Sequence, residues 1–172
     1  MPRTLSFVVA CLVLLAGCTV GGPARTETPT APPGGSTVAL NVTNADTVAH
    51  TVSVGVVEGS VESVELTLAD GGTRTVPAES PETSIFSFAD EEVTEVTLAG
   101  GQTAVRTYEL DPGAIRVEQV SVPSGATLVF VDRTDGRVTA LGLARCPPPT
   151  TTNSADFLVG GYGPLVGLGC AG

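Results

Sequence analysis

From residue 36 onward, hydrophobic and polar residues alternate along much of the chain. Val38, Leu40 and Val42 are each followed by a small or polar residue, and the same pattern recurs over 64–68 and 95–98. A period of two places successive side chains on opposite faces of a β-strand, so one face of each strand should lie on a core and the other in water. Residues 128–131 are all apolar, which predicts a strand that is covered on both faces.

Turn signals separate these segments. Clusters containing glycine, aspartate or proline occur at 70–72, 100–101, 111–113, 123–125 and 135–136. Glycine allows positive φ at such places, and aspartate can accept a hydrogen bond from the backbone just ahead. Between Val117 and Val120 the apolar phase shifts, which predicts a β-bulge. Many short strands of this kind predict an all-β fold, an antiparallel two-sheet sandwich of the immunoglobulin-like type, over residues 36–172.

The first 17 residues predict an export signal. Arg3 precedes an apolar run from Leu5 to Ala16, which suits the core of a signal peptide but is too short to span a bilayer. The run ends in Leu-Ala-Gly-Cys at residues 15–18, which resembles the lipobox of prokaryotic lipoproteins. This resemblance covers only the N-terminal end, and it implies that Cys18 becomes the first mature residue and carries two acyl chains, enough for stable anchoring. The alternative is an ordinary secretory signal that is cut nearby, with Cys18 incidental.

Residues 18–35 predict a disordered linker between Cys18 and the sandwich. Most of them are proline, glycine and threonine, and Val20 is the only large apolar residue among them. Such a segment cannot bury enough surface to offset its ordering entropy. As a relaxed coil it would span roughly 20–25 Å. With lipid on Cys18, the sandwich would be extracytoplasmic and held at the outer face of the cell membrane.

Two cysteines remain after the predicted cleavage and lipidation, Cys146 and Cys170. Outside the cytoplasm such a pair usually forms a disulfide, and the loop-entropy model gives this one about 3.5 kcal/mol. We expect the bridge to pin a C-terminal flap, residues 146–172, to the last main strand at 138–145. The alternative, a thiolate metal site, lacks third and fourth ligands.

The charge balance narrows the choice of partners. Eighteen acidic residues against eight basic ones, all arginine, give a formal charge of −10, which argues against nucleic-acid binding. The acidic residues at 90–92 lack the spaced carboxylates of a calcium loop, so we interpret them as a solvated loop. The glycine-rich segment 161–167 has the wrong spacing for nucleotide binding and contains a proline, so we interpret it as structural.

His50 is the only histidine, and it shares the apolar face of a predicted strand with Val52 and Val54. Together with Asn-Ala-Asp at 44–46, it faintly resembles the first copper-ligand segment of small blue-copper proteins. That family needs a second histidine, a cysteine and usually a methionine near the C-terminus, and the chain has no second histidine and no methionine after Met1. We therefore interpret His50 as a satisfied, partly buried side chain, with no acid or serine near it in sequence that would form a catalytic group. No metal site, no cofactor and no enzymatic activity are expected.

Asn41 begins the triplet Asn-Val-Thr, the acceptor pattern for N-glycosylation. Asn41 and Thr43 share the polar face of the first predicted strand, where a glycosyltransferase could reach them. Asn41 is therefore a candidate glycosylation site.

The composition adds a second resemblance. Arginine without lysine, excess acid, few aromatic residues, the lipobox, the stalk and the strand around His50 together resemble small secreted lipoproteins of halophilic archaea that carry an immunoglobulin-like domain. The resemblance is diffuse over residues 36–145 and rests on pattern. Eighteen acidic residues are a modest load for a salt-saturated habitat, so a high-GC bacterium is the alternative source.

Three functions fit these observations. The first is a membrane-anchored, surface-exposed and non-catalytic β-sandwich module, which contacts an envelope protein partner or has a structural role. The second is a small-ligand or cation-binding lipoprotein that serves a transporter or another envelope complex, which would need a concave pocket near the glycine-rich flap. The third is a small hydrolase, which would need two carboxyl groups that face each other in a cleft.

Overall fold

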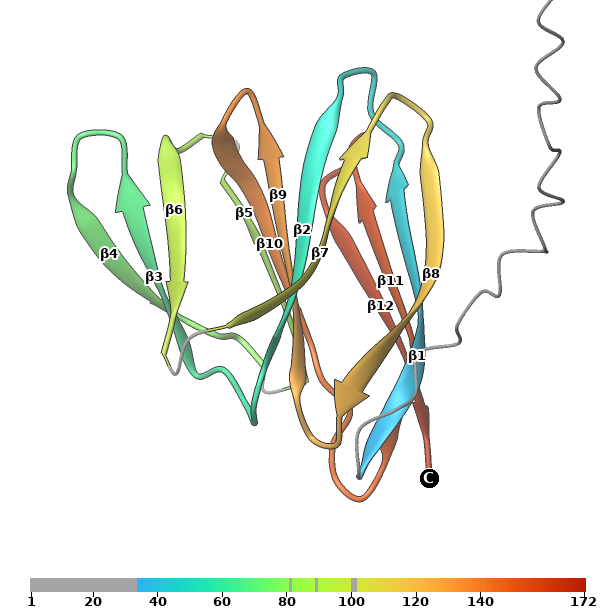
Figure 1. The fold of residues 1–172 in the computed structure, drawn as a ribbon. Helices are drawn as coiled ribbons and strands as arrows, with labels where there is room; N and C mark the ends of the chain where they lie inside the picture. The colour runs from blue at the N-terminus through green and yellow to red at the C-terminus, as the bar shows by residue number, and fades with distance from the viewer. Residues whose placement is uncertain (1–33, 81, 89, 100–101) are drawn as a thin grey trace, which may run out of the picture.

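The computed structural model describes residues 34–172 except 81, 89 and 100–101 (Figure 1). The predicted signal peptide, Cys18 and most of the predicted linker lie outside the described residues, so these remain predictions. Within the described part no residue is helical, and no segment there could cross a membrane as a helix.

The described chain forms twelve strands, in agreement with the alternating pattern. Their bounds are β1 Gly35–Asn44, β2 His50–Val57, β3 Ser63–Leu68, β4 Thr73–Pro77, β5 Thr83–Ser87, β6 Val93–Leu98, β7 Thr103–Leu110, β8 Ile115–Pro123, β9 Thr127–Thr134, β10 Arg137–Ala144, β11 Thr151–Val159 and β12 Leu165–Ala171. The predicted turn at 135–136 joins β9 and β10. Asp135 and Gly136 both have positive φ, 52° and 79°, as a two-residue type I′ hairpin requires.

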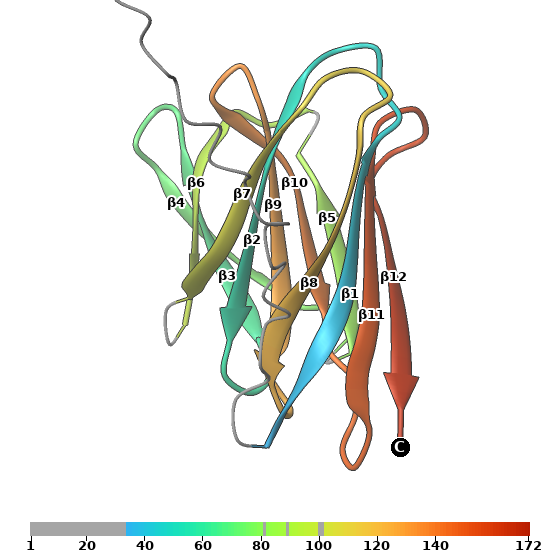
Figure 2. The same cartoon turned by 45° about the vertical axis from the view of Figure 1, so that its right-hand side comes forward.

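The strands form two sheets that pack as a sandwich, which confirms the predicted fold class (Figure 2). The small sheet has the order β12-β11-β1-β8, and the large sheet has the order β4-β3-β6-β10-β9-β2-β7, with β5 also paired to β10. The described strand pairs are antiparallel except for β1 and β11, which run parallel. Immunoglobulin domains have about seven to nine strands, fewer than the two sheets have here. That the sandwich is specifically immunoglobulin-like therefore stays a prediction.

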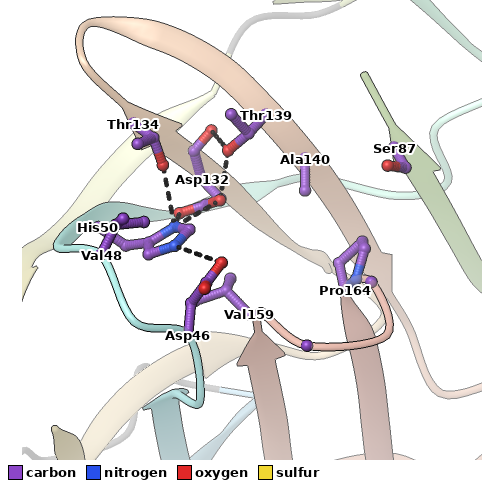
Figure 3. Close-up of a pocket in the computed structure, with 13 residues that line it drawn as sticks. Asp46, Val48, His50, Ser87, Asp132, Thr134, Thr139, Ala140, Val159 and Pro164 are labelled. Atoms are coloured by element: carbon purple, nitrogen blue, oxygen red, sulfur yellow. Dashed lines mark hydrogen bonds and ion pairs between the residues drawn. The ribbon is translucent and has the colours of Figure 1, made fainter. Parts of the chain in front are cut away.

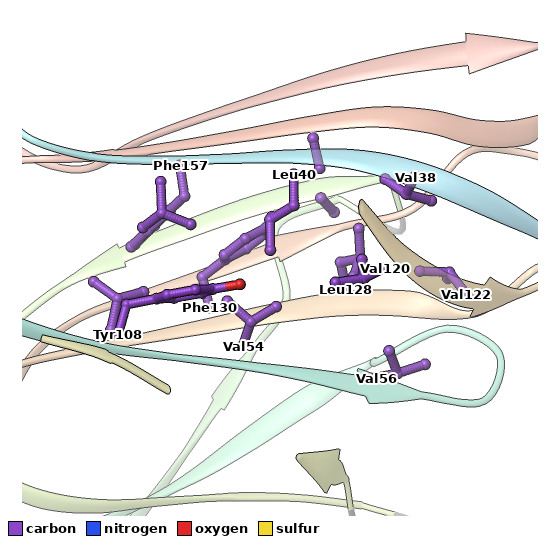
Figure 4. Packing of buried hydrophobic residues seen from close by; sticks show 14 of the residues in the cluster. Val38, Leu40, Val54, Val56, Tyr108, Val120, Val122, Leu128, Phe130 and Phe157 are labelled. Carbon is purple, nitrogen blue, oxygen red and sulfur yellow. The ribbon is translucent and has the colours of Figure 1, made fainter. Parts of the chain in front are cut away.

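One hydrophobic core lies between the two sheets (Figure 4). Phe130 of β9 and Phe157 of β11 stack across it with ring centroids 4.8 Å apart. Gly142 of β10 lies beneath this pair. A Cβ atom there would come within 2.6 Å of Val166 and 2.9 Å of Phe157, so the close approach of the sheets requires glycine at this position.

A second core lies on the opposite face of the large sheet. It joins Val64 and Leu66 of β3 to Val129 and Val131 of β9. Within the described chain, β6 pairs with β10 only at Val93, opposite Val138, whereas β5 pairs with β10 from Ala140 to Ala144. The part of the sheet made of β4, β3 and β6 can therefore bend over the outer face of the large sheet (Figure 1). Residues 128–131 therefore alternate between the two cores, which confirms the prediction of a strand covered on both faces.

The C-terminal segment differs from the predicted flap. Cys146 and Cys170 do form the disulfide. However, most of residues 151–171 lies in β11 and β12, and β11 sits between β1 and β12 within the small sheet. Its residues Ala155 and Phe157 are fully buried. The flap prediction was wrong because the uncharged, glycine-rich sequence does not form a flap on the sandwich but a strand of it: Gly167 and Gly169 let β12 pair closely with β11.

The predicted bulge in β8 was also wrong. The pairing of β8 with β1 is continuous from Pro123 opposite Gly35 to Ile115 opposite Thr43. Val120 and Val122 point into the core, whereas Ile115 and Val117 lie on the outer face, 57% and 69% exposed. The apparent phase shift comes from apolar residues on the solvent face of a regular strand.

Candidate functional site

The sandwich has two distinct ends, because β1 runs from one to the other. With about 3.3 Å of rise for each residue, ten residues separate these ends by about 30 Å. The near pole is the end that holds Gly35, the disulfide and the C-terminus (Figure 1). The far pole is the opposite end, formed by the loops 45–49, 111–114, 135–136 and 160–164.

A pocket of about 390 Å³ lies at the far pole, where the two sheets separate (Figure 3). Its polar lining includes Asp46, His50 and Asp132. Val48, Ala140, Val159 and Pro164 supply apolar walls, and the glycine-rich turn that begins at Gly160 forms one side. The pocket is thus concave and lies beside the glycine-rich segment, the feature that the ligand-binding hypothesis required.

His50 and Asp132 form a buried pair at the pocket. Nδ1 of His50 lies 2.9 Å and 3.0 Å from the two carboxylate oxygens of Asp132. The side chains are only 6% and 2% exposed. Their approach follows from the register of β2 with β9, in which Asp132 is opposite Val52, so that it is diagonal to His50 on the same face of the sheet.

A β-bulge in β10 completes the environment of Asp132. The register of β10 with β9 shifts between Val138 and Ala140, which leaves Thr139 as the extra residue. The Thr139 hydroxyl donates a hydrogen bond to Asp132. The Asp132 carboxylate therefore accepts hydrogen bonds from His50 of β2 and Thr139 of β10, so its oxygens are already bonded within the protein.

Asp46 faces the other nitrogen of the His50 ring. Its carboxylate Oδ2 lies 3.5 Å from Nε2, as the dashed line in Figure 3 marks. This distance is too long for a good hydrogen bond. Nε2 is nevertheless shielded from solvent and has no hydrogen-bond partner in the described part of the chain. The expectation that no acid lies near His50 in sequence was wrong, since Asp46 lies four residues before it. Asp132, which is distant in sequence, places a second carboxylate on the other side of the ring.

The position of Asp46 is fixed by its neighbours. The Thr47 N–H donates to Asp46 Oδ1 at 2.6 Å. This bond is the largest cause of a lowered pKa of Asp46; His50 adds to the effect, and burial opposes it. Asp46 therefore keeps its negative charge. Gly160 packs directly on it, because a Cβ atom there would come within 2.6 Å of the Asp46 side chain.

Asn44 holds the loop that carries Asp46. The side chain of Asn44 is fully buried, and its Oδ1 accepts a hydrogen bond from the Asp46 N–H at 2.8 Å. Its Nδ2 donates to the carbonyl oxygens of Val48, at 2.8 Å, and Leu110, at 2.9 Å. This role was not predicted, although asparagine is a residue whose side chain often bonds the backbone two residues on, in an Asx-turn.

The remaining candidate residues lie elsewhere. Asn41 lies on the outer face of the small sheet, and its Nδ2, the atom a glycan would modify, donates to Asp156 at 3.0 Å. Its glycosylation stays a prediction. In the acidic loop, Glu91 lies 2.6 Å from Arg74 and Glu92 lies 2.8 Å from Arg137, so both carboxylates have arginine partners. Among the described residues no group of three or more histidine, cysteine, aspartate or glutamate side chains could hold a metal ion.

The geometry limits what the pocket can do chemically. Asp46 and Asp132 do not face each other, because His50 lies between them (Figure 3). They therefore do not form the carboxylate pair that glycoside hydrolysis uses. No described hydroxyl lies within hydrogen-bond distance of Nε2, the nitrogen that is free to act as a base. What the pocket offers is a carboxylate and a buried ring nitrogen side by side.

No family model, no curated protein and no solved structure matches this chain. The function is therefore inferred from the site and the surface.

The surface provides a second feature. Among the described residues, the exposed large hydrophobic side chains are Val48, Ile115, Val117, Tyr162 and Leu165. Val48 and Tyr162 lie in loops of the far pole, and Ile115 and Leu165 begin strands that start there. Val117 follows two residues into β8. We call these five residues the apolar rim. They give the far pole apolar surface at both edges of the small sheet, because β8 and β12 are its edge strands. Large exposed apolar surfaces mark interaction sites.

Proposed function

We propose that this protein is a membrane-anchored, surface-exposed lipoprotein whose β-sandwich is a non-catalytic module that binds an envelope partner through its far pole. This proposal is carried by one observation: the point where the chain enters the sandwich and the exposed apolar residues lie at opposite ends of it. The chain enters the described part at the near pole, whereas the apolar rim lies at the far pole. A lipid on Cys18, followed by a flexible linker, would hold the near pole toward the membrane and leave the far pole accessible.

The chemistry of the far pole indicates the kind of partner. Tyr162 is fully exposed, and tyrosine is among the residues that contribute most to protein interfaces. Asp111 and Asp135 are exposed on loops of the same pole. A partner that presents apolar side chains surrounded by arginine or lysine would match both the apolar rim and these carboxylates.

The test is crosslinking in living cells, followed by purification of a tagged copy. The wild type should enrich a defined protein. The Tyr162→Ser/Leu165→Ser variant should lose it, because two apolar contacts are removed at exposed positions where substitution leaves folding intact. Glu58→Ser, an exposed substitution at the near pole, is the matched control and should keep the partner. Equal recovery from the rim variant and the wild type would contradict docking through the far pole.

Anchoring needs a separate test. Mass spectrometry of the mature protein should find Cys18 at the N-terminus with acyl chains attached, and Cys18→Ser protein should no longer remain in the membrane fraction. An unmodified N-terminus at another position would support the ordinary secretory signal instead.

The pocket favours a second function, the binding of a small ligand or cation at the same pole. The observation in its favour is the buried and unpartnered Nε2 of His50.

A further inference from the structure

We propose that the far-pole pocket binds a small organic amine through its primary ammonium group, which sits between the Asp46 carboxylate and Nε2 of His50. This inference rests on the second proposed function, ligand binding, and names the chemical class of the ligand. Its test does not require docking through the apolar rim, although Val48 belongs to both the rim and the pocket wall.

The first step is the hydrogen-bonding state of His50. Both oxygens of the Asp132 carboxylate face Nδ1, so Nδ1 is the ring nitrogen that donates. With the ring neutral, as binding of an ammonium group requires, Nε2 is an acceptor with an unused lone pair. A buried polar atom without a partner costs free energy, and it requires an explanation such as a missing ligand. A donor that enters the pocket would satisfy it.

The second step is the pairing of two acceptors. Nε2 of His50 and Oδ2 of Asp46 lie 3.5 Å apart. A nitrogen atom that carries several N–H groups can lie about 2.9 Å from both, which is the normal hydrogen-bond distance. A primary ammonium has three such donors and a positive charge, so it can bond the ring nitrogen and the carboxylate at once. A quaternary ammonium has none.

The third step is charge. Asp46 stays ionised because the Thr47 N–H lowers its pKa. Asp132 adds a second carboxylate behind the ring, and no arginine is among the residues that line the pocket. With His50 neutral, the pocket therefore has negative charge and no arginine on its walls, which attracts a cation.

The fourth step is size. A volume of about 390 Å³ is far larger than a metal ion and suits a ligand with a carbon skeleton. Val48, Val159 and Pro164 would contact that skeleton. A metal ion would find only the carboxylate and the ring nitrogen as strong ligands, fewer than the four that zinc sites use. The pocket is also preorganised, since Asn44 and Gly160 fix the loop of Asp46.

The test uses the full chain, purified in detergent and held at pH 7.5. Because His50 is the only histidine, its ring gives a single set of imidazole NMR signals that needs no assignment. Butylamine should shift this signal in a saturable manner. Butanol, which has no charge, and tetramethylammonium, which has no N–H, should not. Asp46→Asn should weaken the binding of butylamine by about tenfold or more, the usual effect of losing a charged hydrogen-bond partner.

Asp135→Asn is the matched control. It removes a carboxylate from the same pole, outside the pocket, and should leave binding unchanged. The proposal is overturned if butylamine gives no saturable shift, if tetramethylammonium binds equally well, or if Asp135→Asn weakens binding as much as Asp46→Asn. Saturable binding of Zn²⁺ alone, which butylamine does not displace, would assign the pocket to a metal instead.

The failure of this inference can be told apart from the failure of the proposed functions. A compound without an amine that raises the melting temperature would keep ligand binding and overturn the ammonium assignment. Loss of the crosslinked partner in the rim variant, together with the absence of amine binding, would keep docking and overturn this inference alone.

Discussion

Separate and combined removal of His50 and Asp132 tests whether they form a coupled buried pair. We consider His50→Leu, Asp132→Val and the double variant. In His50→Leu, a carboxylate that is 2% exposed keeps, among the described residues, only the Thr139 hydroxyl as a side-chain donor. Breaking a buried pair in this way costs about 3–5 kcal/mol. Asp132→Val leaves Nδ1 of His50 without its carboxylate and should cost about 1–3 kcal/mol.

The double variant should cost much less than the sum of the two single variants. Replacing both members of a buried hydrogen-bonded pair with apolar residues of similar size can be nearly neutral. We therefore expect a total cost below about 2 kcal/mol and a coupling energy of several kcal/mol. Urea unfolding at pH 7, with the disulfide intact and the slope m compared between variants, measures each value.

The exposed ion pair between Arg74 and Glu91 is the control. Its atoms are 2.6 Å apart, but the side chains are 49% and 37% exposed. The corresponding cycle there should give a coupling energy below about 1 kcal/mol, because water screens the pair. If the costs at His50 and Asp132 add without coupling, or match those of the surface pair, our account of the buried pair is wrong.

Three further outcomes are expected. Replacing Cys146 and Cys170 with serine should lower the free energy of unfolding by about 3.5 kcal/mol, the loop-entropy value for a separation of 24 residues, and an unchanged urea midpoint would contradict this. In a Tyr162→Phe variant, Tyr108 is the remaining tyrosine, and an absorbance titration should find its pKa at about 12, because burial and the nearby Glu118 disfavour the phenolate. The folded state then binds this proton more tightly than the unfolded state, so its contribution to stability is constant below about pH 10 and is lost as the pH rises toward 12; a midpoint near 10 would refute it. Gly142→Ala should cost about 1–3 kcal/mol, because the new Cβ atom would lie 2.6 Å from Val166, and a cost below about 0.5 kcal/mol would show that the sheets can move apart freely.

Local patterns were sufficient to predict much of the fold. The alternation in β1 and β3, the unbroken apolar run of β9 and the Asp135–Gly136 turn all depend on neighbours in sequence, and each was predicted correctly. The place of β11 was not predictable in the same way. Its parallel pairing with β1 joins residues that are more than a hundred positions apart, and it depends on which edge of β1 is free after β8 has paired.

The candidate site was only partly accessible from the sequence. The apolar face that His50 shares with Val52 and Val54 was identified. The contact with Asp132 was not, because it depends on β2 lying beside β9 in one particular register. The bulge at Thr139 has no local signal either. Asp46 was accessible, since it lies four residues before His50, but its role emerges only from the Asn44 turn that directs it toward the ring.

The central position of β1 has a mechanical consequence. On one side β1 is bonded to β8 from Gly35 to Thr43, and on the other to β11 from Ala39 to Asn44. A load applied between the chain entry at Gly35 and the far pole would act along this strand. The antiparallel bonds to β8 lie perpendicular to such a pull and the parallel bonds to β11 slant across it. Both sets therefore share the force and must break together rather than one after another. Under tension the sandwich should therefore resist extension along β1.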